Sequence, residues 1–203
     1  MKRKLLLGFL VSIPVILISI VIILRLTAQP SNEELIERLK EIKAYTTDVE
    51  FVIMNSRDEE RQETKQYYIK DTGGRIDFGE ERTKIYKDDK ILVKDNISNK
   101  ELYMEEAMDD LYSLSFLNNL LSYPIDSEGI KEGQEEWGDT EYIEFTSELF
   151  LNNYNLNKAK VFIDKNERIP IGVIIYDRNN KDRVRIVYKN FEKLKQLDQE
   201  FLN

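Results

Sequence analysis

The feature that most constrains the fold is an alternation of apolar and polar residues, repeated in one short segment after another. In "VEFVI", for example, Val49, Phe51 and Ile53 fall on one face of an extended chain and the charged Glu50 on the other. The segments with this character are 46–56, 61–71, 75–79, 82–96, 99–104, 141–149 and 159–191. Polar turns separate them, so the alternation predicts hairpins in an antiparallel sheet that is wet on one face.

One segment departs from this alternation because it is apolar on both faces. In "IPIGVIIY", residues 169–176, apolar residues occupy both parities, so we expect other parts of the chain to cover both sides of this strand. Two helices, which the spacing of apolar residues predicts near residues 31–44 and 109–124, are the natural candidates to cover it. Gly172 within it indicates a bulge or a close approach of another group.

Two segments change to the helical period. Ser31 and Glu34 form a capping box, which predicts a helix that ends near Ala44. A second amphipathic helix is expected from Asp109, read as its N-cap, to the stop at Pro124. The order of these elements predicts an α+β fold, a large curved antiparallel sheet with helices packed on one face.

The N-terminal run from Leu5 to Leu24 holds twenty residues without a charge. As a helix this run spans roughly 30 Å, the hydrocarbon thickness of a bilayer. Three basic residues precede it and only Arg25 follows closely, so the positive-inside rule places the N-terminus in the cytoplasm and the rest outside. We therefore expect residues 1–30 to be a short basic end with a transmembrane anchor, and 31–203 to be one extracytoplasmic domain. The alternative is a signal cleaved after Ala28.

Charge and composition exclude several functions. Residues 1–30 hold four basic and no acidic residues, so residues 31–203 carry 26 basic and 38 acidic residues, a net charge of −12. A domain this acidic is a poor ligand for nucleic acid. Cysteine and histidine are absent, which excludes disulfides, cysteine nucleophiles, Ser-His-Asp triads and zinc sites built on these residues.

The C-terminal part resembles a known fold family. "VFIDKNERIPIGVIIYDRNNKDRVRIVYKNFEKL" has a strand, an Asp-Lys turn, a strand with the early Pro170, a Tyr-Asp turn, a strand and then Phe191. With the closing segment Leu197 to Phe201, this pattern resembles the LolA/LolB-like lipoprotein-carrier family, whose relatives include the RseB-like stress sensors. The resemblance covers nearly all of residues 31–203 and implies a half-barrel sheet.

Within that family the chain is most similar to the GerS-related germination lipoproteins of spore-forming bacteria. This resemblance implies a non-enzymatic protein partner of a cell-wall amidase, acting in spore cortex modification. Those lipoproteins carry a lipid on a cysteine. Here Leu26, Thr27 and Ala28 lead to Gln29 in place of that cysteine, so a protein helix replaces the lipid as the expected attachment.

An apolar cavity between the sheet and the central helix is the candidate ligand site, and it would take an acyl chain. Its alternative is an ordinary filled core made by the same residues. The candidate lining residues are Phe51, Tyr67, Ile69, Ile76, Phe78, Leu114, Leu117 and Leu121.

A glycan hydrolase is the remaining hypothesis, with Glu135 or Glu136 beside Trp137. Adjacent residues on an extended chain point to opposite faces, which argues against a catalytic pair. No calcium or phosphate-binding motif is present. We therefore predict a binding protein without catalytic residues, metal or cofactor. A protein partner, a cell-wall amidase by resemblance, is the first hypothesis, and lipid or lipoprotein binding is the second. The many tyrosines fit either an interface or strand formation.

Overall fold

The computed structural model describes residue 19 and residues 30–55, 57–125 and 129–202. The chain divides into two compact units, Met1–Glu34 and Leu35–Asn203, and the fold below is that of the second. No helix within the described ranges is long and apolar enough to cross a bilayer. Apart from Ser19, the predicted anchor Leu5–Leu24 lies outside the described residues, so the anchor stays a prediction, as does a boundary at residue 30.

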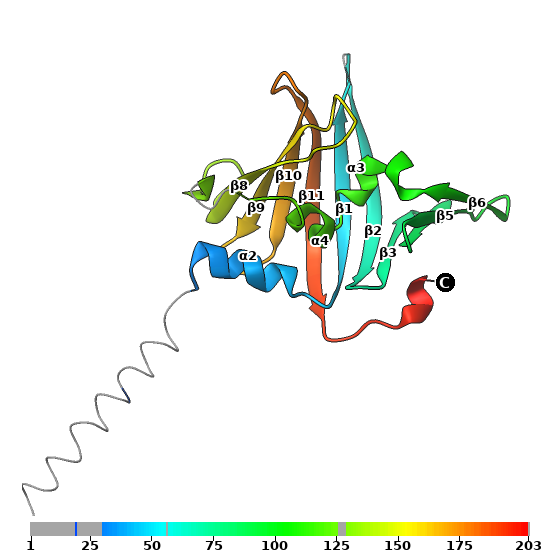
Figure 1. Ribbon diagram of the computed structural model, residues 1–203, viewed down its shortest axis with the longest axis horizontal. Helices are drawn as coiled ribbons and strands as arrows, with labels where there is room; N and C mark the ends of the chain where they lie inside the picture. Colours follow the sequence, from blue (N-terminus) through cyan, green and yellow to red (C-terminus); the bar gives the residue numbers. More distant parts are fainter. Residues whose placement is uncertain (1–18, 20–29, 56, 126–128, 203) are drawn as a thin grey trace, which may run out of the picture. The chain divides into compact units, whose positions relative to one another are not determined.

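An open, antiparallel sheet of eleven strands forms the body of the unit (Figure 1). Its strands are β1 (Ala44–Met54), β2 (Glu59–Ile69), β3 (Gly73–Phe78), β4 (Arg82–Lys87), β5 (Lys90–Asp95), β6 (Lys100–Glu105), β7 (Lys131–Gly133), β8 (Tyr142–Glu148), β9 (Lys158–Asp164), β10 (Pro170–Tyr176) and β11 (Asp182–Leu194). Their order is β6-β5-β4-β3-β2-β1-β11-β10-β9-β8-β7. The predicted antiparallel sheet is confirmed.

The first and last strands pair in the middle of this sheet. Val49 of β1 lies opposite Tyr188 of β11, and Phe51 lies opposite Ile186. All other neighbouring strands are consecutive along the chain. The β4–β5 turn is an example of how they are joined, since Asp88 and Asp89 both have positive φ (54° and 59°), as a tight two-residue hairpin turn requires.

The helical segments are shorter than the sequence predicts. They are α2 (Asn32–Lys40), the 3-10 turn η1 (Glu106–Met108), α3 (Asp110–Ser113), α4 (Leu117–Leu121) and the 3-10 turn η3 (Gln199–Leu202). In α2, Ser31 Oγ accepts the predicted cap bond from the Glu34 amide at 3.2 Å. The expectation of one central helix from Asp109 to Pro124 is wrong, because the chain leaves the helix at residues 114–116.

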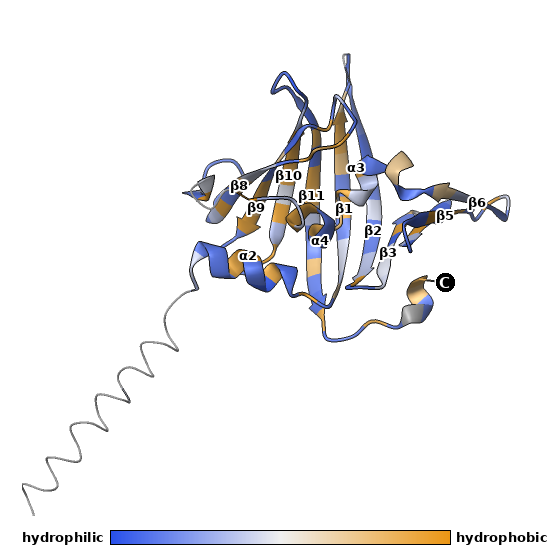
Figure 2. Cartoon of the chain, in the orientation of Figure 1, coloured by the Kyte–Doolittle hydropathy of each residue, from blue (hydrophilic) through white to orange (hydrophobic). Residues whose placement is uncertain are grey.

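The α-helices α2, α3 and α4 lie on one face of the sheet, here called the helix face. Leu35, Ile36 and Leu39 of α2 share one core with Leu117 of α4 and Ile175 of β10. Figure 2 shows that the central strands and α2 both carry many apolar residues. Helices on one face of a large sheet are therefore as expected, with burial of apolar side chains as the cause.

On the opposite, outer face, β9 and β10 are covered by a loop and not by a helix. Trp137 packs on Phe162 with ring centroids 5.4 Å apart, and the two belong to a small core with Ile174. A Cβ atom on Gly172 would lie 2.3 Å from the Trp137 ring, and the β9–β10 register shifts between Pro170 and Gly172. Gly172 thus marks both a bulge and a close approach, and the idea that helices cover both sides of this strand is wrong.

Candidate functional site

The break between α3 and α4 defines the space where a ligand cavity was expected. Phe116 has extended backbone angles (φ −73°, ψ 119°). The chain therefore leaves the helix at this residue, and the Phe116 ring packs against the sheet. It packs on Tyr86 at 5.1 Å and on Tyr68 at 5.9 Å between ring centroids. A Cβ atom on Gly74 of β3 would lie 2.4 Å from this ring. A glycine in β3 is therefore what lets the Phe116 ring reach the strand backbone.

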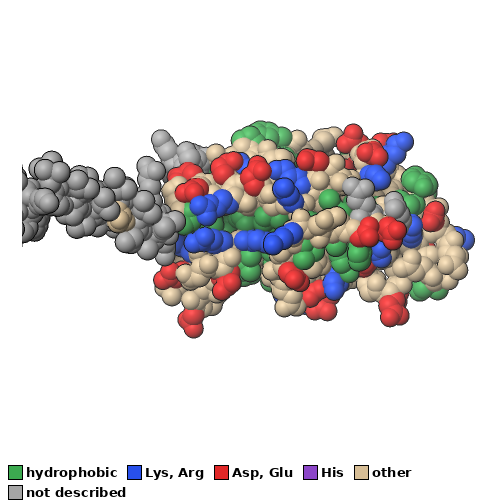
Figure 3. All heavy atoms as spheres, turned by 90° about the horizontal axis from the view of Figure 1, so that it is seen from below, with side chains coloured by type: hydrophobic (Ala, Val, Ile, Leu, Met, Phe, Trp, Pro, Cys, Tyr) green, Lys and Arg blue, Asp and Glu red, His purple; other side chains and the backbone are tan. Residues whose placement is uncertain are grey.

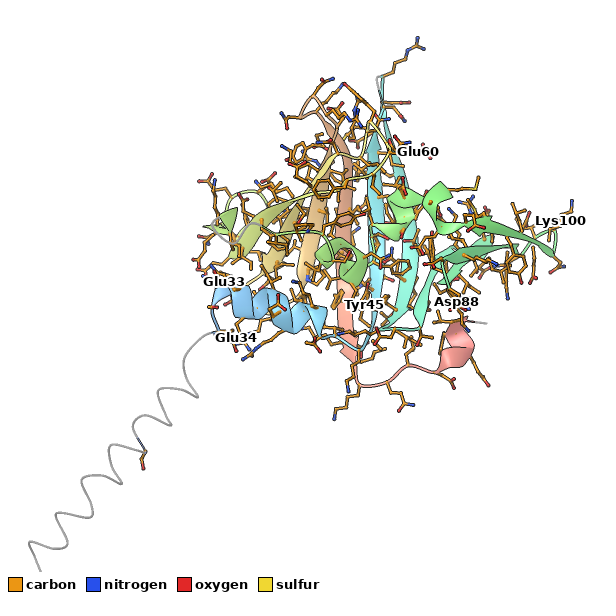
Figure 4. The ribbon with its side chains drawn as sticks, in the orientation of Figure 1. Glu33, Glu34, Tyr45, Glu60, Asp88 and Lys100 are labelled. Atoms are coloured by element: carbon orange, nitrogen blue, oxygen red, sulfur yellow. The ribbon has the colours of Figure 1, made fainter. Side chains whose placement is uncertain are left out.

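Two tyrosine hydroxyls satisfy the backbone groups that the break exposes. The Leu117 amide donates to the Tyr45 hydroxyl at 3.0 Å, and the Tyr188 hydroxyl donates to the Ser115 carbonyl at 2.8 Å. Burial raises the pKa of both tyrosines above the ordinary value, so both hydroxyls keep their protons. Figure 4 shows Tyr45 near the base of the sheet. Unpaired backbone groups at a buried break would be costly, and these hydroxyls remove that cost.

A buried polar contact fixes the same break from the side of β2. Gln66, which is fully buried, donates from Nε2 to Ser115 Oγ at 2.7 Å. Ser115 Oγ in turn donates to the Tyr112 carbonyl at 2.6 Å. The strand therefore turns a polar side chain toward the helix face, because a polar partner is present there.

Aromatic rings occupy the space between the sheet and this broken helix. Tyr112 of α3 meets Phe51 at 4.9 Å and Phe78 at 5.0 Å, both edge to face. Tyr45 stacks on Tyr68 at 5.2 Å and on Phe191 at 4.7 Å. Rings at these separations are in contact, so the rings form two packed groups on the helix face, one around Tyr112 and one around Tyr45.

The residues proposed as a cavity lining divide between the two faces. Six lie on the helix face and are buried, namely Phe51, Ile76, Phe78, Leu114, Leu117 and Leu121. Tyr67 lies on the outer face, where it stacks on Phe201 of η3 at 5.3 Å. Ile69 also lies there and lines a groove of about 930 Å³ at the lower end of the sheet. The structure brings six of the eight together and separates two.

That groove carries charges of both signs, and so do its surroundings. Its lining includes Lys43, Lys70 and Lys195, together with Glu41 and Asp71. Lys70 Nζ donates to the Lys40 carbonyl at 3.0 Å and lies 3.4 Å from Glu41. Figure 3 views this end from below and shows Lys and Arg side chains gathered beside apolar atoms, with acidic side chains around them. The mixed charge gives the groove no preference for an anion or a cation.

A buried ion pair was not foreseen from the sequence. Asp109 Oδ2 accepts from Lys84 Nζ at 2.6 Å and from the Tyr86 hydroxyl at 2.7 Å. Both charged side chains are only 11% exposed. Burial, followed by the Asp109 charge, raises the pKa of Tyr86 far above its ordinary value. Asp109 occupies the predicted N-cap position, before α3, but its side chain makes no cap bond. The carboxylate instead ties α3 to β4.

The proposed hydrolase residues occupy the outer-face loop. Glu136 lies 3.4 Å from Lys160 Nζ, which also binds Glu144 at 2.7 Å. Glu135 is exposed. Trp137 is held against Phe162 and Gly172, so it packs on the sheet beside these carboxylates. Within the described residues, no three His, Cys, Asp or Glu side chains are close enough together to hold a metal ion.

Comparison with protein families decides where the chain belongs. A model of the family described as "Sporulation protein YdcC-like" matches residues 2–202. The chain belongs to the YdcC-like sporulation protein family. No curated protein sequence matches it.

Solved structures show that this YdcC-like chain shares its fold with other proteins. An uncharacterized conserved protein from Thermus thermophilus matches with a TM-score of 0.55 at 11% identity, over 85% of this chain and 93% of the other. A putative outer membrane lipoprotein-sorting protein domain from Vibrio parahaemolyticus matches with a TM-score of 0.51 at 10% identity, over 83% and 94%. The expected likeness to the lipoprotein-carrier fold is confirmed.

GerS also lies among the structures that this family member resembles. The complex of the CwlD amidase with the GerS lipoprotein from Clostridioides difficile matches with a TM-score of 0.46 at 16% identity, over 82% of this chain and 98% of the other. A likeness of that size says nothing about what the present chain binds.

Proposed function

We propose that this chain is a non-enzymatic binding module, anchored in the cell membrane with its main domain outside, that acts in sporulation through a protein partner. Membership of a sporulation family supports the process. The long uncharged run Leu5–Leu24 and the three basic residues before it support the anchor and its orientation. The carrier-type fold supports binding, since it is shared with a lipoprotein-sorting domain.

The observation that carries the choice of a protein over a lipid is the packing of aromatic rings on the helix face. A carrier that takes acyl chains needs an apolar space between its sheet and its helices. Here Phe51, Tyr112 and Phe78 are in contact across that space, and Phe116 reaches the β3 backbone at Gly74. Packing of this kind supports recognition of a partner at the outer surfaces of the fold.

The finer form of the proposal names a cell-wall amidase as the partner. Its support is the sequence resemblance to the GerS-related group within the lipoprotein-carrier fold family. An acidic exterior domain also suits a partner with a basic surface, because complementary charge speeds association and helps to exclude wrong partners.

The test is capture of the full chain by chemical cross-linking in sporulating and in growing cells, followed by mass spectrometry of proteins and of extracted lipid. We expect a cell-envelope protein at high yield in sporulating cells, an uncleaved N-terminus at Met1, and no lipid in stoichiometric amount. Bound acyl lipid without a protein partner would favour the carrier alternative. Glycan cleavage that is lost in Glu135→Gln and Glu136→Gln variants would establish the hydrolase hypothesis and refute the proposal of a non-enzymatic binding module.

A further inference from the structure

The two edges of the sheet are protected to different degrees. At one edge β7 has only three residues, and a Cβ atom on its Gly133 would lie 2.6 Å from the Tyr142 ring. Short edge strands of this kind resist pairing with another chain. At the other edge β6 has six residues, and five of them are exposed. Among the described residues no strand pairs with the outer side of β6, so its backbone donors and acceptors on that side are open to solvent.

The exposed apolar side chains of the unit gather at this same edge. Of the seven large apolar residues that are exposed among the described residues, four lie between residues 97 and 108. They are Ile97 (74% exposed), Leu102 (64%), Tyr103 (67%) and Met108 (72%). Figure 2 shows apolar colour continuing along β5 and β6, and Figure 4 places Lys100 at the far tip of this hairpin. Exposed apolar groups concentrated along one edge, and not scattered singly over the surface, indicate an interaction surface.

The register shows that this surface extends the core. Met104 lies opposite Ile91, and Leu102 lies opposite Val93. Ile91, Val93 and Met104 all pack in the cluster around Phe78. Leu102 is the next position on the helix face, and it is exposed where its neighbours are covered. A strand laid beside β6 would place its own alternate apolar side chains on this row.

Charge indicates what kind of segment fits. Glu101 and Glu105 of β6 lie opposite Lys94 and Lys90 of β5, and Lys94 Nζ is 3.8 Å from Glu101. Lys or Arg residues placed opposite these glutamates on an added strand would continue this alternation of charge. The whole region 31–203 has 26 basic and 38 acidic residues. A basic segment would meet a complementary potential here, whereas an acidic one would be repelled.

We infer that β6 is the docking edge for an extended segment of the protein partner, in which apolar residues alternate with Lys or Arg. The segment pairs with β6 as one more strand, covers Leu102 on the helix face, and sets its basic residues against the glutamates. The inference rests on the proposed function, because it assigns a surface to the partner proposed there.

The test places a photo-crosslinking phenylalanine analogue at Tyr103 of the full chain in sporulating cells, and separately at Phe150. Phe150 is a matched control, since it is 79% exposed and lies after β8, away from β6 along the sheet. We expect the Tyr103 position alone to crosslink to the partner, at a segment with alternating apolar and basic residues. A crosslink to lipid, to a second copy of this chain, or to an acidic or helical segment overturns the inference.

A pair of substitutions separates this inference from the proposed function. Leu102→Lys puts a cation on the apolar row and should lower partner capture about tenfold, a loss typical of one interface anchor. Phe150→Lys should leave capture unchanged. If the wild type and both variants capture the partner equally, the proposed function stands and β6 is not the docking edge. If no variant and no wild-type chain captures a protein, the proposed function itself fails. Circular dichroism of both variants checks that the fold is kept.

Discussion

The helix-facing core has two parts that are built on different principles. Beneath α2, strands β8–β10 contribute aliphatic side chains such as Val161, Val173 and Ile175, which have no polar atoms. Beneath the α3–α4 break, the core consists of rings such as Phe116, with the buried Lys84–Asp109 pair beside them. An aliphatic core is fixed mainly by volume and tolerates repacking. A core of rings and polar contacts allows fewer arrangements, so the second part fixes where the broken helix lies.

Among the substitutions that test this contrast, Phe116→Ala should reduce stability the most. The ring is fully buried against Tyr86 and Tyr68, and its loss should lower the free energy of unfolding by about 3–5 kcal/mol. In the aliphatic part, Ile175→Val should cost only about 1 kcal/mol. Urea denaturation measures both, and Phe150→Ala, at an exposed site, should change stability little. Equal losses at Phe116 and Ile175 would contradict the contrast.

Loss of the Lys84–Asp109 ion pair should have the next largest effect on stability. Asp109→Ala leaves the Lys84 cation buried without its partner, and should cost about 3 kcal/mol. Replacing both residues together, as Lys84→Met with Asp109→Leu, should cost far less, because no charge is then left unpaired. Thermal unfolding of the two proteins gives the difference. A double variant as unstable as the single one would show that the pair itself holds α3 in place.

On the outer face of the aliphatic part, Gly172→Ala tests the contact with the loop. The new methyl group would overlap the Trp137 ring, so the loop must shift at a cost of about 1–3 kcal/mol. Trp137 is the only tryptophan, and its fluorescence should therefore move to longer wavelength as the ring becomes wetter. Gly138→Ala is a useful control, since no atom lies within 4 Å of that position, although its positive φ adds strain of its own. An unchanged spectrum for Gly172→Ala would contradict the close approach.

Tyr45→Phe should have a smaller effect in the aromatic part. It removes the hydroxyl that accepts from the Leu117 amide and leaves that amide buried without a partner, at a cost of about 1–3 kcal/mol. The fold should remain, while the amide of Leu117 should exchange its hydrogen faster with deuterium. Tyr154→Phe, at an exposed tyrosine, serves as the control. Unchanged exchange at Leu117 would mean that the break is held by packing alone.

The smallest effect is expected in the β10–β11 turn and depends on pH. Hydrogen bonds from the Lys181 amide and from Arg183 hold the pKa of Asp177 below its ordinary value. A carboxyl group whose pKa is lower in the folded state stabilises the fold above its unfolded pKa, and this contribution is lost as the pH falls through the folded value. Asp177→Asn should therefore be less stable than wild type at pH 7, with the gap closing below about pH 4. Urea midpoints of both proteins measured across this pH range check the prediction.

The aliphatic part and most strands could be predicted from the sequence because their pattern is local. Alternation predicted β1, β2 and β8–β11, and the doubly apolar "IPIGVIIY" correctly predicted cover on both faces. The helix break could not be predicted, since its partners are distant. Tyr45 and Tyr188 lie 72 and 73 positions from the residues whose backbone groups they satisfy. An apolar spacing of three and four gives no sign of such contacts.

The sequence left open which side chains of β2 point toward the helix face, again because their partners are distant along the chain. Tyr67 and Tyr68 are adjacent, and choosing Tyr67 for the interior also sends Ile69 inward and Gln66 outward. The structure takes the opposite parity, with Gln66 fully buried against Ser115 and Tyr67 stacked on Phe201. A buried glutamine is favourable only where a partner is supplied, and that partner lies in the broken helix.

The pairing of β1 with β11 sets an order of events for the nascent chain. Val49 and Tyr188 are neighbours in the sheet, yet nearly the whole unit lies between them along the sequence. The hairpins on either side can form from local contacts, but they cannot join until the last strand has left the ribosome or a translocation channel. Such distant contacts slow folding. The chain therefore stays in two loosely connected halves while it is being made, and its final strand is what turns them into one sheet.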